Sequence, residues 1–139
     1  MTQSQTASFA VEPQQVQPAA QWVENVARDL GLSGSDPMRL SVIAEELFAN
    51  SLHHAEIEPG AEISLNLTRD GEHVRLDYVE PGQAFNPLEI TVPETPNLES
   101  WPIGGLGLRL IHRFAERTGY ERVGNANRLS VWLGGAGEA

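Results

Sequence analysis

Two segments of alternating apolar and polar residues, each folded back by a short turn, constrain the fold more than any other feature of this sequence. Residues 63–78 carry apolar side chains at every second position on either side of a turn at 69–72. Residues 120–133 repeat the pattern around a turn at 124–127. A period of two with turn residues between is typical of antiparallel strand pairs that bury one face. We therefore expect a largely antiparallel sheet.

Helical spacing of apolar residues precedes and separates these strand pairs. Apolar side chains recur every three or four positions over 13–30 and over 37–54, and a third such segment runs from the glycines at 104 to residue 114. Residues 7–12 are suited to a short edge strand. The order β-α-α-β-β-loop-α-β-β predicts an α+β fold, a two-layer α/β sandwich whose mostly antiparallel, mixed sheet is covered by helices on one face.

The chain length favours a single domain. A chain of 139 residues is within the ordinary size of one compact unit, so we expect one domain over 1–139. The polar ends, 1–7 and 134–139, are expected to be frayed. Five prolines fall between 81 and 102, and we expect 88–103 to be a loop that covers the glycines after it.

Composition excludes several classes of function. Nineteen acidic residues against nine basic ones give a formal net charge of −10, whereas a general nucleic-acid binder needs an excess of cations. All nine cations are arginines, so a P-loop and a Schiff-base lysine are excluded. There is no cysteine for a disulfide or a thiolate metal site. The N-terminal residues resemble no secretion signal, and no apolar stretch approaches about 18 residues, so we expect a cytoplasmic protein without a membrane segment.

A polar stripe on the second expected helix is the first candidate for chemistry. Glu46, Asn50 and His54 follow one another at four-residue spacing and therefore share one helix face. A carboxylate one turn from an amide oxygen can act as a base beside a bound Mg²⁺. The alternative is a solvated polar face. The histidines show no HExxH spacing, and no GxSxG motif indicates a hydrolase.

The second candidate follows the strand that ends near residue 80. Glu80 is in phase with the apolar residues of that strand, so its carboxylate is expected on the buried side, where it needs a partner. Asp77 is in the opposite phase and is expected to face water. Pro81 and Gly82 suit a tight turn. The alternative is a structural loop with a partly exposed Glu80.

The third candidate is the run of glycines at 104, 105 and 107, before and within the start of a helix. Glycines there let backbone N–H groups approach an anion, and the helix dipole favours negative charge. A glycine cluster alone is weak support for an anion-binding site, because glycines also occur in turns and at close contacts between elements.

Together, the order and spacing of these segments resemble the Bergerat-fold (GHKL) ATPases, and among them the small anti-sigma-factor serine kinases of bacterial partner-switching systems. The resemblance runs from about residue 9 to 133. It rests on four segments: LSVIAEELFANSLHHA (40–55), YVEPGQAFNP (78–87), GGLGLRLIHRF (104–114) and GNANRLSVWL (124–133).

The resemblance implies a role for each matching residue. Glu46 is implied as the general base for a substrate serine, and Asn50 as a ligand of the Mg²⁺ that bridges the phosphates of ATP. His54 is implied to lie near the nucleotide, and Gly82 to let its loop approach adenine. Gly105 and Gly107 are implied to bring backbone amides to the phosphates. The other implied residues of the ATP/ADP site are Ala84, Phe85, Gly104, Leu106 and Leu108.

One position departs from the family pattern. Where the family has Asp, whose carboxylate accepts a hydrogen bond from the adenine amino group, this chain has Glu80. The extra methylene moves the carboxylate by roughly one bond length, and hydrogen bonds weaken steeply when their geometry is lost. Adenine affinity is therefore the part of the resemblance that this residue puts in question.

The resemblance also implies partners. They are an anti-anti-sigma factor with a STAS domain, which the kinase phosphorylates with ATP, and a sigma factor, which it binds in alternation; a homodimer is implied as well. Two alternatives stay open. One is a binding module that sequesters a regulator with little or no nucleotide binding and no kinase activity. The other is an ATPase-like accessory that activates a partner enzyme by contact.

Overall fold

The computed structural model describes residues 3–54, 57–58, 60–89 and 106–134. Its five strands form one sheet in the order β1-β2-β3-β5-β4, and every neighbouring pair is antiparallel. The two expected hairpins are present as the β2–β3 and β4–β5 pairs. The strands are β1 (Ser4–Ala10), β2 (Glu62–Asp70), β3 (His73–Pro81), β4 (Arg117–Val123) and β5 (Ala126–Gly134).

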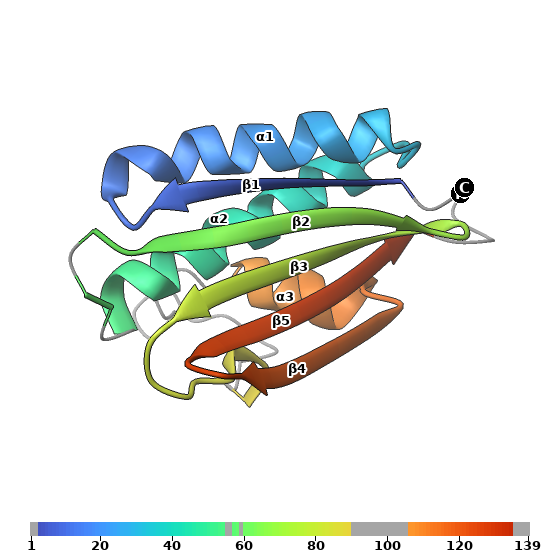
Figure 1. Cartoon of the computed structure of the whole chain (residues 1–139). Helices are drawn as coiled ribbons and strands as arrows, with labels where there is room; N and C mark the ends of the chain where they lie inside the picture. The colour runs from blue at the N-terminus through green and yellow to red at the C-terminus, as the bar shows by residue number, and fades with distance from the viewer. Residues whose placement is uncertain (1–2, 55–56, 59, 90–105, 135–139) are drawn as a thin grey trace, which may run out of the picture.

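The helices all lie against one face of this sheet, and the other face is uncovered by them (Figure 1). This arrangement confirms the expected α+β sandwich, except that the sheet is antiparallel rather than mixed. No helix in the described part of the chain is both long and apolar enough to cross a membrane. The α-helices are α1 (Val16–Asp29), α2 (Asp36–His54) and α3 (Leu106–Phe114), with short 3-10 turns at Pro13–Gln15 and Pro87–Glu89.

The core lies between the helices and the sheet. Phe48 and Leu40 of α2 are fully buried against Ile63, Leu65 and Leu76 of the central strands. Each such side chain contributes about 1.5–3 kcal/mol through removal from water. Alternation along β3 and β5 therefore decides which of their side chains face α2, and this is what directs Glu80 toward the helix layer.

The sheet extends further toward both ends of the chain than the sequence indicates. Residues 4–7 were expected to be frayed, but β1 begins at Ser4, which is paired with Thr68. The hydroxyls of Ser4 and Thr6 donate to Asn66 Oδ1 at 3.2 and 2.9 Å, which ties the polar strand to β2. Gly134, also expected to be frayed, belongs to β5 and pairs with His73. The prediction from polar composition was therefore wrong about where β1 begins and where β5 ends.

The expected loop at 88–103 is only partly described. Residues 88 and 89 belong to the second 3-10 turn, and 90–103 lie outside the described residues.

Asp77 corrects another expectation. Asp77 lies on the helix-free face of the sheet, in the phase predicted, but its side chain is 4% exposed rather than open to water. Arg75 Nε donates to its Oδ2 at 2.9 Å and Ser130 Oγ to its Oδ1 at 2.5 Å, while Arg128 Nε lies 3.5 Å away. Long side chains on the neighbouring positions cover the carboxylate, an effect that alternation cannot predict.

Candidate functional site

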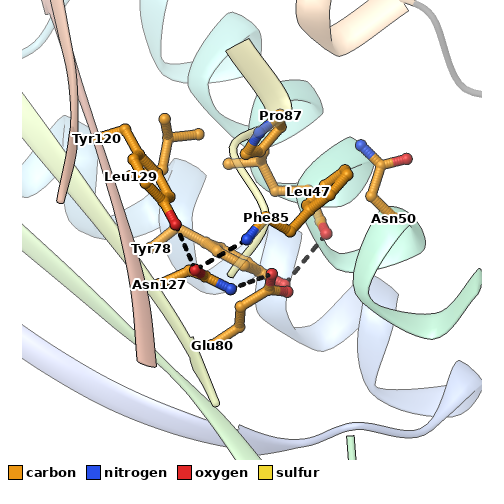
Figure 2. Close-up of a pocket in the computed structure, with 9 residues that line it drawn as sticks. All are labelled: Leu47, Asn50, Tyr78, Glu80, Phe85, Pro87, Tyr120, Asn127 and Leu129. Carbon is orange, nitrogen blue, oxygen red and sulfur yellow. Dashed lines mark hydrogen bonds between the residues drawn. The ribbon is translucent and has the colours of Figure 1, made fainter. Parts of the chain in front are cut away.

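A small pocket lies between α2, the inner side of β3 and β5, and the chain that follows β3. Its lining includes two of the expected site residues on different elements, Asn50 of α2 and Glu80 of β3, and a third, Phe85, on the following loop (Figure 2). These three residues are thus brought together from positions up to 35 apart in the sequence. The remaining lining residues are Leu47, Tyr78, Pro87, Tyr120, Asn127 and Leu129.

Glu80 lies in this pocket with both carboxylate oxygens engaged. Its side chain is 5% exposed, as its phase in β3 predicted. Ser51 Oγ, on α2, donates to Oε2, and Asn127 Nδ2, on β5, lies 3.3 Å from Oε1. The predicted need for partners is therefore met by two neutral donors rather than by a cation.

Burial raises the pKa of Glu80 above its usual range, while the hydrogen bonds from Ser51 and Asn127 lower it in part. Tyr78 lies beside this carboxylate, and its hydroxyl is 2.6 Å from Ser51 Oγ and donates to the Leu47 carbonyl at 3.1 Å. Burial also raises the pKa of Tyr78, so the phenol is neutral. The pocket therefore presents one acidic group among uncharged donors.

Asn127 connects this acid to the loop after β3. Besides approaching Glu80, its Nδ2 donates to the Gln83 carbonyl at 2.8 Å. Its Oδ1 accepts from Phe85 N at 3.1 Å and from the Tyr120 hydroxyl at 2.5 Å, contacts drawn in Figure 2. Arg122 Nη1 lies 3.0 Å from the same oxygen. One buried amide thus ties together β3, β4 and the loop.

Asn50 lines the pocket from α2, across from Tyr120 (Figure 2). Its Nδ2 is buried, yet it has no hydrogen-bond partner in the described part of the chain. A buried donor without a partner costs about 1–3 kcal/mol, so a polar ligand at this position would satisfy it. Asn50 is therefore the residue whose chemistry most directly indicates that something binds here.

Glu46 lies one helical turn before Asn50, on the side of α2 that meets α3. Its side chain is 7% exposed, and none of the hydrogen bonds found among the described residues reaches its carboxylate. Burial and repulsion from Glu45 raise the pKa of Glu46 to about 7. A carboxylate that titrates near neutrality is matched to general-base chemistry. Glu46 does not line the pocket around Glu80.

Gly107 is the described glycine that comes closest to Glu46. A Cβ added to Gly107 would lie 2.3 Å from Glu46 Cβ. The absence of a side chain therefore lets the first turn of α3 approach the carboxylate, a reason for glycine that adds to the one expected from the sequence.

The other expected site residues are placed as follows. Gly82 has φ +124° and lines a surface cleft with Arg122 and Asn125 rather than the pocket, and Ala84 is exposed. His54 is the last residue of α2. Leu106 begins α3, and Leu108 is buried in the core, whereas Gly104 and Gly105 lie outside the described residues.

A family comparison agrees with this layout. Residues 9–133 match the model of the histidine kinase-like ATPase domain, which accounts for most of the chain. The chain belongs to the histidine kinase-like ATPase family. Membership implies ATP or ADP as its ligand and indicates an ATP-dependent activity. No curated protein matches the sequence.

A solved structure shares the fold of this histidine kinase-like ATPase domain. The crystal structure of the RsbU and RsbW domains of Rv1364c from Mycobacterium tuberculosis superposes with a TM-score of 0.64 at 10% identity. The match covers 94% of the present chain and 32% of the chain in that structure, so the present chain spans about a third of that chain's length.

The side chains of the pocket offer the hydrogen-bonding groups that a nucleotide needs, but the cavity between them is smaller than a nucleotide base. Asn50 offers an unpaired donor and an amide oxygen, and Glu80 offers an acceptor for a base. The cavity, however, has a volume of about 10 Å³, room for roughly one water molecule. Phe85 and Pro87 form part of its wall on the loop side.

Sequence reasoning missed the two donors of Glu80. Helical spacing places Ser51 one turn after Leu47, but no pattern in the sequence indicates that Glu80 is its partner. Asn127 was placed in a turn, although it is in phase with Leu129 and therefore inward in β5. Extending the alternation of β5 by one step would have found Asn127.

Proposed function

We propose that this chain is an ATP-binding anti-sigma factor and protein serine/threonine kinase. Its proposed substrate is a STAS-type anti-anti-sigma protein in a partner-switching pathway. One observation carries the kinase activity: Glu46, whose pKa is about 7, precedes by one turn Asn50, whose buried amide nitrogen lacks a partner. Family membership supports ATP as the phosphoryl donor. The partners rest on the four motif segments that resemble partner-switching kinases.

Glu46 is the proposed general base. Its carboxylate accepts the proton of a substrate serine or threonine hydroxyl as the hydroxyl oxygen forms a bond to the γ-phosphorus of ATP. The bond from that phosphorus to the β,γ-bridging oxygen breaks, and ADP leaves. Burial suits Glu46 to this step, because a desolvated carboxylate is a stronger base and keeps the proton that it gains near neutral pH.

We place the phosphates of ATP beside Asn50 and the first turn of α3 in this proposal. Asn50 Oδ1 would hold Mg²⁺, since amide oxygens are among its ligands, and Mg²⁺ supplies neutralisation of the charge on the phosphates. Asn50 Nδ2 remains available to donate to a phosphate oxygen. No three His, Cys, Asp or Glu side chains gather into a metal site in the described part of the chain. The phosphates would therefore complete the coordination.

The kinase proposal is tested with the Glu46→Gln variant, which keeps the shape of the side chain and removes its basicity. We expect ADP binding within about twofold of the wild type and phosphorylation of a purified STAS-domain substrate reduced at least about 100-fold, the usual range for loss of a general base. Glu62→Gln, an exposed acid on β2, is the matched control. Full phosphotransfer by Glu46→Gln would overturn the assignment of the base.

A second candidate function is a binding module that sequesters its partner without using nucleotide. The small cavity favours it, because Phe85 and Pro87 leave no room for a base in this conformation. Titration calorimetry with ATP and ADP, with and without Mg²⁺, separates the two functions. Micromolar, Mg²⁺-dependent binding supports the kinase, whereas no heat up to millimolar nucleotide supports the binding module.

A further inference from the structure

Helices α2 and α3 meet along a seam that has the proposed base at one end and a pair of arginines at the other. Gly107 of α3 lies against Glu46 of α2, because a Cβ on this glycine would be 2.3 Å from Glu46 Cβ. Seven residues further along α3, the ring centroid of Phe114 lies 3.7 Å from the guanidinium of Arg39, which is seven residues before Glu46 on α2. The two helices are therefore antiparallel, and Arg39 and Glu46 lie on the same face of α2, about two turns apart.

Phe114 has a second arginine beside it. The guanidinium of Arg113 lies 5.5 Å from the centroid of the ring, and the attraction between a cation and an aromatic face favours this position. Arg113 is exposed and makes no ion pair with another residue in the described part of the chain, whereas Arg39 Nη1 lies 2.8 Å from Asp36 Oδ1. Met38, directly before Arg39, is 53% exposed. We call Met38, Arg39, Arg113 and Phe114 the arginine patch.

The charge around this patch opposes that of the rest of the chain. Helix α3 carries Arg109 and Arg113 and no acidic residue, so its formal charge is +2. The whole chain has a formal charge of −10, so the residues outside α3 carry −12. An acidic partner is therefore repelled by most of the molecule and attracted to this helix, and such complementarity fixes where a partner docks. The exposed thioether of Met38 suits an apolar side chain of that partner, since methionine adapts to varied shapes.

Resting on the proposed function, we propose that the arginine patch is the docking surface for the protein substrate, and that it fits a region of the substrate with acidic side chains around an exposed apolar one. Two helical turns put the patch about 10 Å from Glu46. An ordinary protein interface covers about 800 Å² on each partner, so one interface spans both places. A substrate that docks here therefore brings its hydroxyl group within reach of the base. The residues that line the pocket around Glu80 are not part of the patch.

The test measures binding and phosphorylation of a purified STAS-domain substrate by the full chain. Arg113→Glu reverses one charge of the patch at an exposed position. We expect the Kd for the substrate, measured by titration calorimetry, and the KM to rise at least about tenfold, while kcat and the affinity for ADP stay within about twofold of the wild type. The effect should shrink at high salt, because salt screens exposed charges. Arg113→Lys keeps the charge and should change the Kd by less than about threefold.

Arg28→Glu is the matched control. It makes the same change of charge on α1, at a side chain that is 51% exposed and paired with Glu24. We expect it to change the Kd and the KM by less than about twofold. Met38→Ala tests the apolar part of the patch and should raise both constants about fivefold at low and at high salt alike, because the lost contact is hydrophobic.

The outcomes separate this docking surface from the kinase activity. An unchanged Kd in Arg113→Glu, or an equal loss in Arg28→Glu, overturns the docking surface and leaves the kinase proposal standing. Binding that Arg113→Glu weakens, without phosphorylation by the wild type, keeps the docking surface and overturns the kinase activity. Self-association that Arg113→Glu abolishes would assign the patch to a second copy of this chain and overturn the proposal. A wild type that does not bind the substrate overturns both proposals.

Discussion

A side chain at position 107 would collide with Glu46. An ideal Cβ on Gly107 lies 2.3 Å from Glu46 Cβ and 2.8 Å from its Cγ, with the Val42 carbonyl oxygen at 3.2 Å. The first turn of α3 therefore packs directly on the part of α2 that carries the proposed base. Helix α3 cannot keep this position with any residue other than glycine there, so the placement of the base and the packing of the two helices depend on each other.

The Gly107→Ala variant tests this dependence. Helix propensity alone would make alanine about 1 kcal/mol more favourable than glycine, but overpacking costs typically about 1–3 kcal/mol, so we expect net destabilisation. Chemical denaturation measures it. Gly119→Ala is the control, because no heavy atom lies within 4 Å of the added Cβ, and its effect should stay within about 0.5 kcal/mol. A stabilised Gly107→Ala would show that α3 is free to move.

The raised pKa of Glu46 predicts how stability depends on pH. The folded protein holds the proton up to about pH 7, whereas the unfolded chain loses it near 4.5. The unfolded state therefore binds fewer protons between these values, and the contribution of Glu46 to the free energy of unfolding falls as pH rises through this window. The Glu46→Gln variant has no carboxyl group at this position, so its free energy of unfolding does not fall in this way as pH rises. We expect it to be more stable than wild type by on the order of 2 kcal/mol at pH 8 and similar at pH 4.5.

Denaturant titrations of both proteins at pH 4.5, 6 and 8 measure that difference. Glu80 titrates in both, so its own raised pKa cancels in the comparison. A difference between variant and wild type that stays constant across pH would contradict the assignment of a raised pKa to Glu46.

The fold could be predicted because it depends on local periodicity. Alternation over 63–78 places Ile63, Leu65 and Leu76 inward, and the structure buries all three. The strand ends could not be predicted this way, since Ser4 is held in β1 by a partner 64 residues away. Asp77 shows the same limit: its face was predicted correctly, but its burial depends on arginines of β3 and β5.

The candidate site was predictable in its charged groups and not in their partners. Helical spacing puts Glu46 and Asn50 on one face, and strand phase buries Glu80. The contact between Glu80 and Ser51 joins α2 to β3 and arises only when the two layers pack. Asn127 was missed because the segment at 124–127 has turn composition, and pairing with β3 extends the strand through it.

Replacing Phe85, in the pocket wall, by a smaller residue is expected to raise the affinity for nucleotide. Phe85 is half-buried and lines a cavity of about 10 Å³. Phe85→Ala removes the ring from this wall, so we expect ADP to bind more tightly than it binds to the wild type, with most of the gain in the association rate measured by stopped-flow. Weaker ADP binding by the variant would show that the ring contacts the base instead of blocking it.

Replacing the amide of Asn127 by a carboxylate is expected to lower the free energy of unfolding by an amount that depends on pH. Asn127→Asp keeps the shape of the side chain but removes the donors to Glu80 and to the Gln83 carbonyl, and it sets two carboxylates side by side. Buried like charges disfavour the ionised forms and Arg122, 3.0 Å from Oδ1, offsets only part of this repulsion, so the pair should hold one proton above the usual range. We expect a loss of about 2–4 kcal/mol in unfolding free energy at pH 8 and a smaller loss at pH 5, where the shared proton replaces the missing donor. Asn125→Asp, exposed in the β4–β5 turn, is the control and should change stability by less than about 0.5 kcal/mol. Equal losses for Asn127→Asp at both pH values would mean that Asn127 holds the loop after β3 without acting on Glu80.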